Sequence, residues 1–133
     1  MPILGLSLQQ DATGGTTTGG TAMALSSDGQ EVKNGIHVAD MGESDFTVRT
    51  NMTLRTRNPQ KQADGTYSQG KHRVTIVVQK DLGDDGIVFN LIRIEMEVHP
   101  KTLASELLNL EMLGAQVFTD SDLADFRANG SLA

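Results

Sequence analysis

Residues 72–98, HRVTIVVQKDLGDDGIVFNLIRIEMEV, decide the fold of this chain. Apolar and polar residues alternate in both halves of the stretch. The side chains of a strand point alternately to its two faces, so this period of two indicates half-buried strands. The segment 81–86 between the halves is rich in aspartate and contains two glycines, which predicts a tight loop. We therefore expect two long antiparallel strands, 72–80 and 87–98.

A third long strand is predicted just before this pair, from Phe46 to Arg57. Its apolar side chains fall on one face and its polar ones on the other, and Asn58-Pro59 ends it. Three long alternating strands in succession favour an antiparallel sheet. The polar face of this strand contains Arg49, Asn51, Thr53, Arg55 and Arg57.

The N-terminal third predicts three shorter strands, 3–10, 21–26 and 36–41. Residues 11–20 contain four glycines among small polar residues, which is typical of a flexible hairpin tip. A phosphate-binding loop would need a following helix and usually a lysine, and neither is present.

The C-terminal third changes to a helical period. Leucines recur at helical spacing between Pro100, which fits a first helical turn, and Gly114, which fits a C-terminal cap. A shorter helix is predicted from Thr119, with Gly130 ending it. The predicted fold class is α+β: a six-stranded antiparallel sheet followed by two helices. We expect one domain, 1–133, divided into an N-terminal hairpin and short strand (1–45), long strands (46–98) and helices (99–133).

The charge of the chain is unevenly distributed. The net charge is −6, which disfavours nucleic-acid binding by the chain as a whole. Residues 49–80, however, contain seven basic residues and one acidic residue, a local charge of +6, so the remainder carries −12. Nucleic-acid contact depends on the local patch. A solvated strand face with scattered charges remains the alternative interpretation.

Several classes of function are disfavoured by composition. The chain has no cysteine, so disulfides and thiolate metal sites are excluded. Its three histidines are isolated, and no nucleophile motif is present, so we expect no enzyme and no cofactor. No apolar run reaches the ~18–20 residues that cross a bilayer, and no secretory signal is expected. We expect a soluble protein without a membrane partner.

One chain's helices cannot cover such a sheet completely. A helix of about fourteen residues is roughly 20 Å long. Six strands span about 25–30 Å at ~4.8 Å per strand. The last strand also leaves an open edge. Dimerisation, with sheets joined edge to edge and helices exchanged, would solve both problems.

The chain resembles the coat proteins of the single-stranded RNA bacteriophages (leviviruses). The order and lengths of the predicted elements are similar throughout, and four local segments carry the resemblance: FTVR (46–49), HRVTIVV (72–78), FNLIRIEM (89–96) and the leucine-rich stretch 103–113. The resemblance implies a homodimer with one continuous ten-stranded sheet, helices outside, and single-stranded viral RNA held on the inner face. It implies a capsid protein of an icosahedral virion, assembled in the cytoplasm of a bacterial host.

The resemblance also implies RNA-hairpin contacts on alternate residues of the long strands. These fall on Arg49, Asn51, Thr53, Arg73, Thr75, Val77, Phe89, Leu91 and Arg93. Arg55 and Arg57 join the set because they share this face and arginine can donate two parallel hydrogen bonds to phosphate. Val77 and Leu91 depart from the polar contacts usual in the family. Phe89 would either stack on an unpaired base or pack in the dimer seam, and Arg93 would either contact RNA or pair with Glu95 and Glu97.

Two further alternatives follow from the residues. Asp81, Asp84 and Asp85 form either a polar turn or a site for a hard cation such as calcium. The whole chain would be either a capsid protein or a non-viral dimeric module that binds RNA or a small ligand on an open sheet.

Overall fold

A computed structural model describes residues 5–12 and 17–132 of the chain. The described chain forms two compact units, residues 5–8 with 22–100 and residues 9–12 and 17–21 with 101–132. Six strands precede the two helices in the chain, and the strands form one antiparallel sheet in chain order, which confirms the predicted fold class. The prediction that residues 1–133 are one domain stays a prediction.

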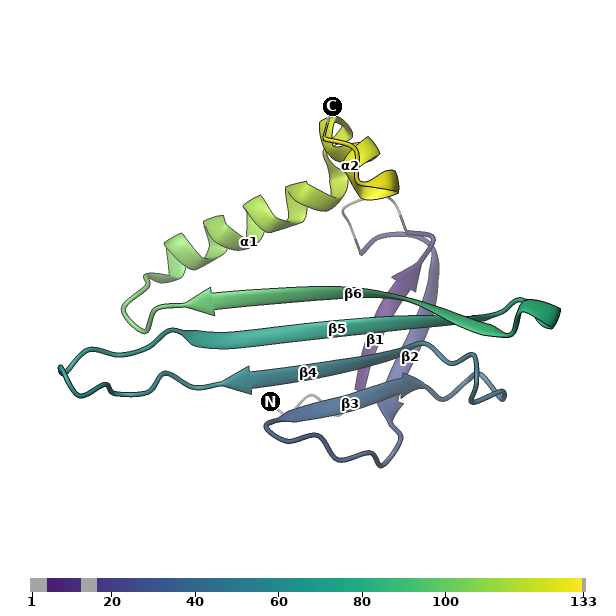
Figure 1. The fold of residues 1–133 in the computed structure, drawn as a ribbon, viewed down its shortest axis with the longest axis horizontal. Coiled ribbons are helices and arrows are strands. Elements are labelled where there is room, and N and C mark those ends of the chain that lie inside the picture. Colours follow the sequence, from purple (N-terminus) through teal and green to yellow (C-terminus); the bar gives the residue numbers. More distant parts are fainter. Residues whose placement is uncertain (1–4, 13–16, 133) are drawn as a thin grey trace. The chain divides into compact units, whose positions relative to one another are not determined.

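The strands of the sheet lie close to the predicted ranges. In Figure 1, the last four run side by side and the first two cross their direction. Residues 3–4 and 13–16, within the predicted first strand and hairpin tip, lie outside the described residues. The strands are β1 (Gly5–Gln10), β2 (Thr21–Ser27), β3 (Gly35–Asp40), β4 (Asn51–Arg57), β5 (Gly70–Asp81) and β6 (Ile87–Val98).

The prediction that β4 begins at Phe46 is wrong. Residues 46–50 lie outside any strand, and residues 46–48 turn because the Asp45 carboxylate accepts hydrogen bonds from the Thr47 amide (2.9 Å) and hydroxyl (2.6 Å). The Val48 amide also donates to the Asp45 carbonyl at 3.2 Å. Aspartate often stabilises turns in this way, and here the local bonds replace strand pairing.

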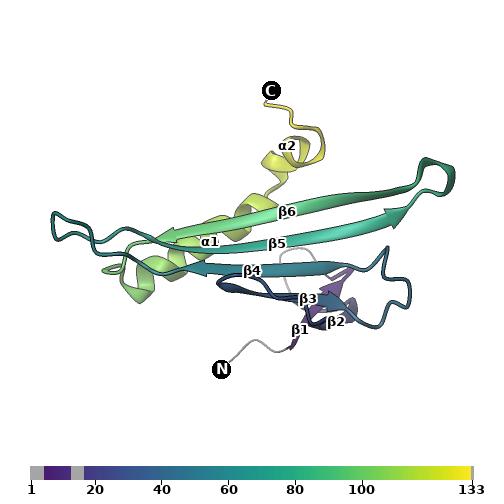
Figure 2. The same ribbon diagram turned by 60° about the horizontal axis from the view of Figure 1, so that its bottom comes forward.

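The core lies between the N-terminal hairpin and the middle strands. Leu25 of β2 and Val38 of β3 are fully buried, and Met23 and Met52 complete the cluster. Partly buried residues of four strands pack against it: Leu6 and Leu8 of β1, Ile36 of β3, Leu54 of β4, and Val74 and Ile76 of β5. The second view in Figure 2 shows the hairpin lying beside β3. The buried apolar set is aliphatic, as the near absence of aromatic residues predicts.

The register of β4, β5 and β6 separates two faces of the sheet. Met52 pairs with Ile76, which pairs with Ile92, so these even-numbered residues share one apolar face. Thr53 pairs with Thr75, which pairs with Arg93, on the opposite face. This confirms the predicted alternation within the three strands.

The second unit contains α1, which spans Ala104–Thr119 and therefore differs from the predicted helix. The Glu106 carboxylate accepts a hydrogen bond from the Leu103 amide at 2.8 Å, so the helix starts after Leu103 rather than at Pro100. The helix continues through Gly114, since a glycine costs only about 1 kcal/mol in a helix interior. The expectation that Gly114 is a cap is wrong.

The chain turns after α1 through the short 3₁₀ helix Ser121–Leu123 into α2, Ala124–Asn129. Asp120 caps this turn, because its carboxylate accepts from the Asp122 amide at 2.8 Å. Arg127 of α2 donates to the carbonyls of Val117 and Asp120 at 2.8 Å, which satisfies the end of α1. Gly130 has a φ of 74° and ends α2, as predicted.

Substituting the two neighbouring residues Met52 and Thr53 tests the assignment of the faces. Met52→Asp should destabilise the fold by about 3–5 kcal/mol, because it buries an unpaired charge. Thr53→Asp lies on the opposite, polar face and should cost far less. Urea unfolding of both variants measures the difference, and equal destabilisation would contradict the assigned faces.

Candidate nucleic-acid interface

The odd-numbered residues of β3 to β6 form one face of the sheet, which we call the basic face. In β4, β5 and β6, this face carries five arginine and lysine side chains, whereas the even-numbered face carries only Lys80. The cations of the basic face are Arg55, Arg57, Lys71, Arg73 and Arg93. Three carboxylates, Asp81, Glu95 and Glu97, share the face, so the charge across these strands is moderately positive.

Strand pairing arranges the basic face in rows across the sheet. One row contains His37, Thr53, Thr75 and Arg93. The rows on either side of it are Arg55, Arg73 and Glu95, and Ala39, Asn51, Val77 and Leu91.

Five of the predicted contact residues surround one hollow of about 220 Å³ on this face. Its walls are hydroxyl and guanidinium groups, which donate hydrogen bonds. The lining residues are Thr53, Arg55, Arg73, Thr75 and Arg93. Donors of this kind suit the oxygen atoms of phosphate and ribose.

The arginines around this hollow differ in their contacts. Arg73 Nε donates to Glu95 Oε2 at 2.6 Å, and its Nη2 contacts the same oxygen. By contrast, Arg55 and Arg93 are exposed, and their guanidinium groups have no hydrogen bond or ion pair with any part of residues 5–12 and 17–132. Glu95 therefore pairs with Arg73 rather than Arg93, and the two uncommitted guanidinium groups are available to a ligand.

Glu95 is held in its charged form by its neighbours. The hydrogen bond from Arg73 lowers the pKa of the Glu95 carboxyl, and the nearby Lys71 ammonium lowers it further. Lys71 Nζ lies 3.6 Å from Glu95 Oε1 and also contacts Glu97. The contact with Glu97 is the main reason why the pKa of Lys71 is raised. These four side chains form an ion-pair ladder between β5 and β6.

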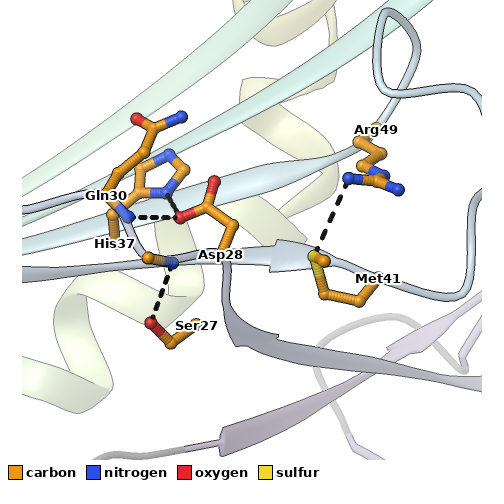
Figure 3. Close-up of polar contacts among 7 residues, drawn as sticks. Ser27, Asp28, Gln30, His37, Met41 and Arg49 are labelled. Atoms are coloured by element: carbon orange, nitrogen blue, oxygen red, sulfur yellow. Dashed lines mark hydrogen bonds and ion pairs between the residues drawn. The ribbon is translucent and has the colours of Figure 1, made fainter.

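Arg49 lies in the turn before β4 rather than on a strand. Its Nε donates to the Glu43 carbonyl at 2.7 Å, and its Nη1 lies 3.8 Å from Met41 Sδ, as Figure 3 shows in part. Gln79 of β5 lies 3.1 Å from the Thr47 and Arg49 carbonyls and supports the turn. Arg49 still borders the basic face, since it lines a polar hollow of about 450 Å³ together with His37, Asn51 and Gln79.

His37 and Asp28 form a second polar pair at the border of this hollow. His37 Nδ1 lies 2.9 Å from Asp28 Oδ1, which also accepts from the Gln30 amide at 3.1 Å (Figure 3). Partial burial raises the pKa of Asp28, but the bonds from His37 and Gln30 outweigh it and leave the pKa lowered overall. The pair joins the β2–β3 turn to β3.

Two of the three apolar residues predicted to contact RNA, Phe89 and Leu91, lie in the first half of β6. Phe89 is 62% exposed and Leu91 is 43% exposed in the single chain. Phe89 pairs across the sheet with Gln79, and Leu91 pairs with Val77. Both roles predicted for Phe89, base stacking and packing in a dimer seam, require such exposure.

The acidic loop between β5 and β6 is a tight turn. Asp81 Oδ1 accepts from the Gly83 amide at 2.8 Å, and Asp84 and Asp85 lie in the 3₁₀ turn Gly83–Asp85. Among the described residues, no group of three or more acidic or histidine side chains could hold a metal ion. Within one chain, the Asp81 carboxylate has a hydrogen-bond partner in the turn itself, and its position requires no calcium ion.

Sequence reasoning did not place Lys33 or Lys71 in the contact set. Lys71 has the same parity as Arg73 and could have been found from the alternation. Lys33 precedes β3, and only the folded chain brings it beside Arg55, Arg57 and Lys71.

Solved structures of bacteriophage particles share this fold. The chain is 36% identical to the protein of the virus-like particle of bacteriophage GQ-907, with a TM-score of 0.79, over 93% of this chain and 97% of that one. The chain belongs to a family of bacteriophage coat proteins. This agrees with the resemblance to single-stranded RNA phage coat proteins in the sequence. The coat protein is therefore a structural protein and not an enzyme.

The proteins of more distant particles are similar to the coat protein only in fold. The virus-like particle proteins of bacteriophages AVE019 and NT-214 are 9% and 7% identical, both with TM-scores of 0.71. They cover 98% and 100% of this chain, and this chain covers 97% and 99% of theirs. No protein-family model and no curated protein sequence matches the chain. Within the described residues, no helix is long and apolar enough to cross a bilayer.

The His37–Asp28 pair predicts a dependence of stability on pH. Because the pKa of Asp28 is lowered in the folded state, its carboxylate stabilises the fold above the unfolded pKa of about 3.9. That contribution is lost as the pH falls through the folded pKa. Asp28→Asn should lower the free energy of unfolding by about 1 kcal/mol at pH 6–7. The difference from wild type in urea titrations should shrink at pH 2.5–3, and a constant difference would contradict the role of the charge.

Proposed function

We propose that this coat protein forms a homodimer, that the dimers assemble into the icosahedral shell of a virion, and that the basic face holds the single-stranded RNA genome. Membership of a family of bacteriophage coat proteins supports assembly into a shell and argues against a non-viral binding module. The observation that supports RNA binding is the hollow lined by Arg55 and Arg93, both without partners among the described residues.

The sheet offers an apolar surface that supports dimerisation. Val78, Ile92 and Ile94 of the even-numbered face are each about two-fifths to one-half exposed in the single chain. A neighbouring hollow of about 430 Å³ is lined partly by Ile36, Leu54 and Val74. Full burial of an exposed aliphatic side chain contributes about 1.5–3 kcal/mol, and burying the remaining exposed part of each of these contributes roughly half of that. A second copy would bury this surface.

The helical unit has an apolar surface of its own. Leu108, Met112 and Leu113 of α1 are more than half exposed, and Leu110 and Val117 are more than two-fifths exposed. At sixteen residues, α1 is about 24 Å long and remains shorter than a six-stranded sheet is wide. Exchange of helices between two copies would cover more of both surfaces.

The open edge of β6 supports the same arrangement. β6 is twelve residues long, lies at the end of the strand order and, among the described strands, pairs with β5 alone. An unpaired strand edge is a template for another strand. Antiparallel pairing of β6 with the partner's copy would join two sheets and extend the basic face across the dimer.

The chemistry of the basic face favours RNA over other ligands. Arginines provide donor pairs for phosphate, and threonines provide hydroxyl groups for sugar and base contacts. Exposed Phe89 offers a surface on which an unpaired base can stack. A capsid protein also needs a surface that compensates the charge of a packaged genome, and the local positive charge meets that need despite the net charge of −6.

Expression of the full chain without phage genes tests assembly. We expect spherical particles by electron microscopy and elution in the void volume in size-exclusion chromatography. Their absorbance at 260 nm should exceed that of protein alone, because host RNA is packaged. Soluble monomers or isolated dimers at high concentration, in every buffer tried, would contradict the proposal.

Arg93→Gln tests the RNA contact on the basic face. Each lost phosphate contact should lower the slope of log affinity against log salt by about 0.7 for single-stranded RNA. Binding of a labelled oligoribonucleotide across a salt series measures the slope. Lys80→Gln is the matched control, since Lys80 lies in β5 on the opposite face. Equal slopes for wild type and Arg93→Gln would show that this face does not contact RNA.

A further inference from the structure

A second hollow, of about 380 Å³, gathers more cations than the one described above. Five basic side chains line it: Lys33, Arg55, Arg57, Lys71 and Arg73. They come from the turn before β3 and from β4 and β5. Glu95 of β6 is the only carboxylate among the residues that line it. We call this the cationic hollow.

The cations of this hollow fall into two groups, those with a carboxylate partner and those without one. Lys71 and Arg73 contact Glu95, Arg73 through two nitrogen atoms and Lys71 at 3.6 Å. The side chains of Lys33, Arg55 and Arg57 have no ion pair or hydrogen bond within the part of the chain that the structure describes. Glu95 in the hollow and Glu97 beside Lys71 thus offset part of the repulsion among five like charges and leave three cations uncompensated.

The Glu95 contact has the geometry of a phosphate contact. Each of its oxygen atoms faces a cation: Oε2 accepts from Arg73, and Oε1 lies 3.6 Å from Lys71 Nζ. A phosphodiester presents two charged oxygen atoms of the same kind to the same donors. The Glu95 side chain is 31% exposed, and ion pairs so close to solvent are weak. An incoming anion can therefore take its place.

We propose that the cationic hollow binds a phosphate of the single-stranded RNA backbone, and that Glu95 occupies Arg73 and Lys71 until that phosphate displaces it. The inference rests on the proposed RNA binding and adds Lys33 and Lys71 to the contact set. Glu95 then sets the affinity of the coat protein for RNA. Without RNA it holds the cations together, and with RNA it turns to solvent.

Substituting Glu95 tests the displacement. Glu95→Gln removes the competing charge and should tighten binding of a labelled oligoribonucleotide about two- to fivefold at low salt. Glu111→Gln, on α1, is the control for net charge because Glu111 does not line the hollow. The gain should be the same for oligomers of adenylate and of uridylate, since phosphate contacts carry no sequence information.

A double-mutant cycle shows whether Glu95 acts through Arg73. Arg73→Gln removes the main partner of Glu95, so adding Glu95→Gln to it should give a smaller gain than in the wild-type chain. A full gain in the Arg73→Gln background would overturn the displacement, because Glu95 would then act only by general charge repulsion.

Substituting Lys33 and Arg57 tests the part of the site that lies outside the hollow lined by Arg93. Lys33→Gln and Arg57→Gln should each lower the salt slope, by up to about 0.7, the value for one lost phosphate contact. Circular dichroism and thermal melting confirm that each variant is folded.

The outcomes separate this inference from the proposed function. If the wild-type chain binds RNA and Arg93→Gln lowers the salt slope, while Lys33→Gln and Arg57→Gln keep the wild-type slope, the inference alone is overturned. If the wild-type chain does not bind RNA at any salt concentration, the proposed function fails and the inference fails with it. Lower slopes for both variants together with tighter binding by Glu95→Gln support the inference.

Discussion

The antiparallel register of β4, β5 and β6 is the constraint on which the rest of this structure depends. A slip of one residue would move every side chain of a strand to the other face. The loop between β5 and β6 helps to set this register: Gly83 and Gly86 have φ angles of 68° and 80°, which favour glycine. Asp81 accepts from the Gly83 amide and pairs with Ile87 across the first step of the hairpin. The apolar face, the basic face and the ion-pair ladder all depend on the register that this first pair sets.

A single sheet whose two faces differ this strongly is incomplete as an isolated chain. The N-terminal hairpin buries the apolar face around Val38 and Met52 but leaves Ile92 and Ile94 partly exposed. Several apolar residues of α1 are exposed as well. Large exposed apolar surfaces mark sites of association. A subunit that exists to assemble gains from this incompleteness, because the free energy of burial becomes available only when copies meet.

The charges of the basic face are balanced locally rather than across the chain. Glu95 and Glu97 hold Lys71 and Arg73, while Arg55 and Arg93 keep their charges free of partners among the described residues. A net charge of −6 is compatible with an anionic ligand because screening limits the range of charges to about 10 Å at ordinary ionic strength. The alternation that builds the sheet therefore also determines where a polyanion can lie.

The sequence by itself determined the strands, their faces and the order of the elements, since a period of two and a helical period are local properties that a short segment displays. The alternation alone assigns Thr53, Thr75 and Arg93 to one face, and the strand pairing confirms it. The ends of the elements were less predictable. Hydrogen bonds to the Asp45 carboxylate place the start of β4 later than predicted, and α1 continues beyond Gly114. Only the tertiary structure decided which cations have partners, because Arg73 and Glu95 are twenty-two residues apart and meet through strand pairing. The same holds for Lys33, which reaches the cationic hollow because the chain turns into β3 beside Arg55.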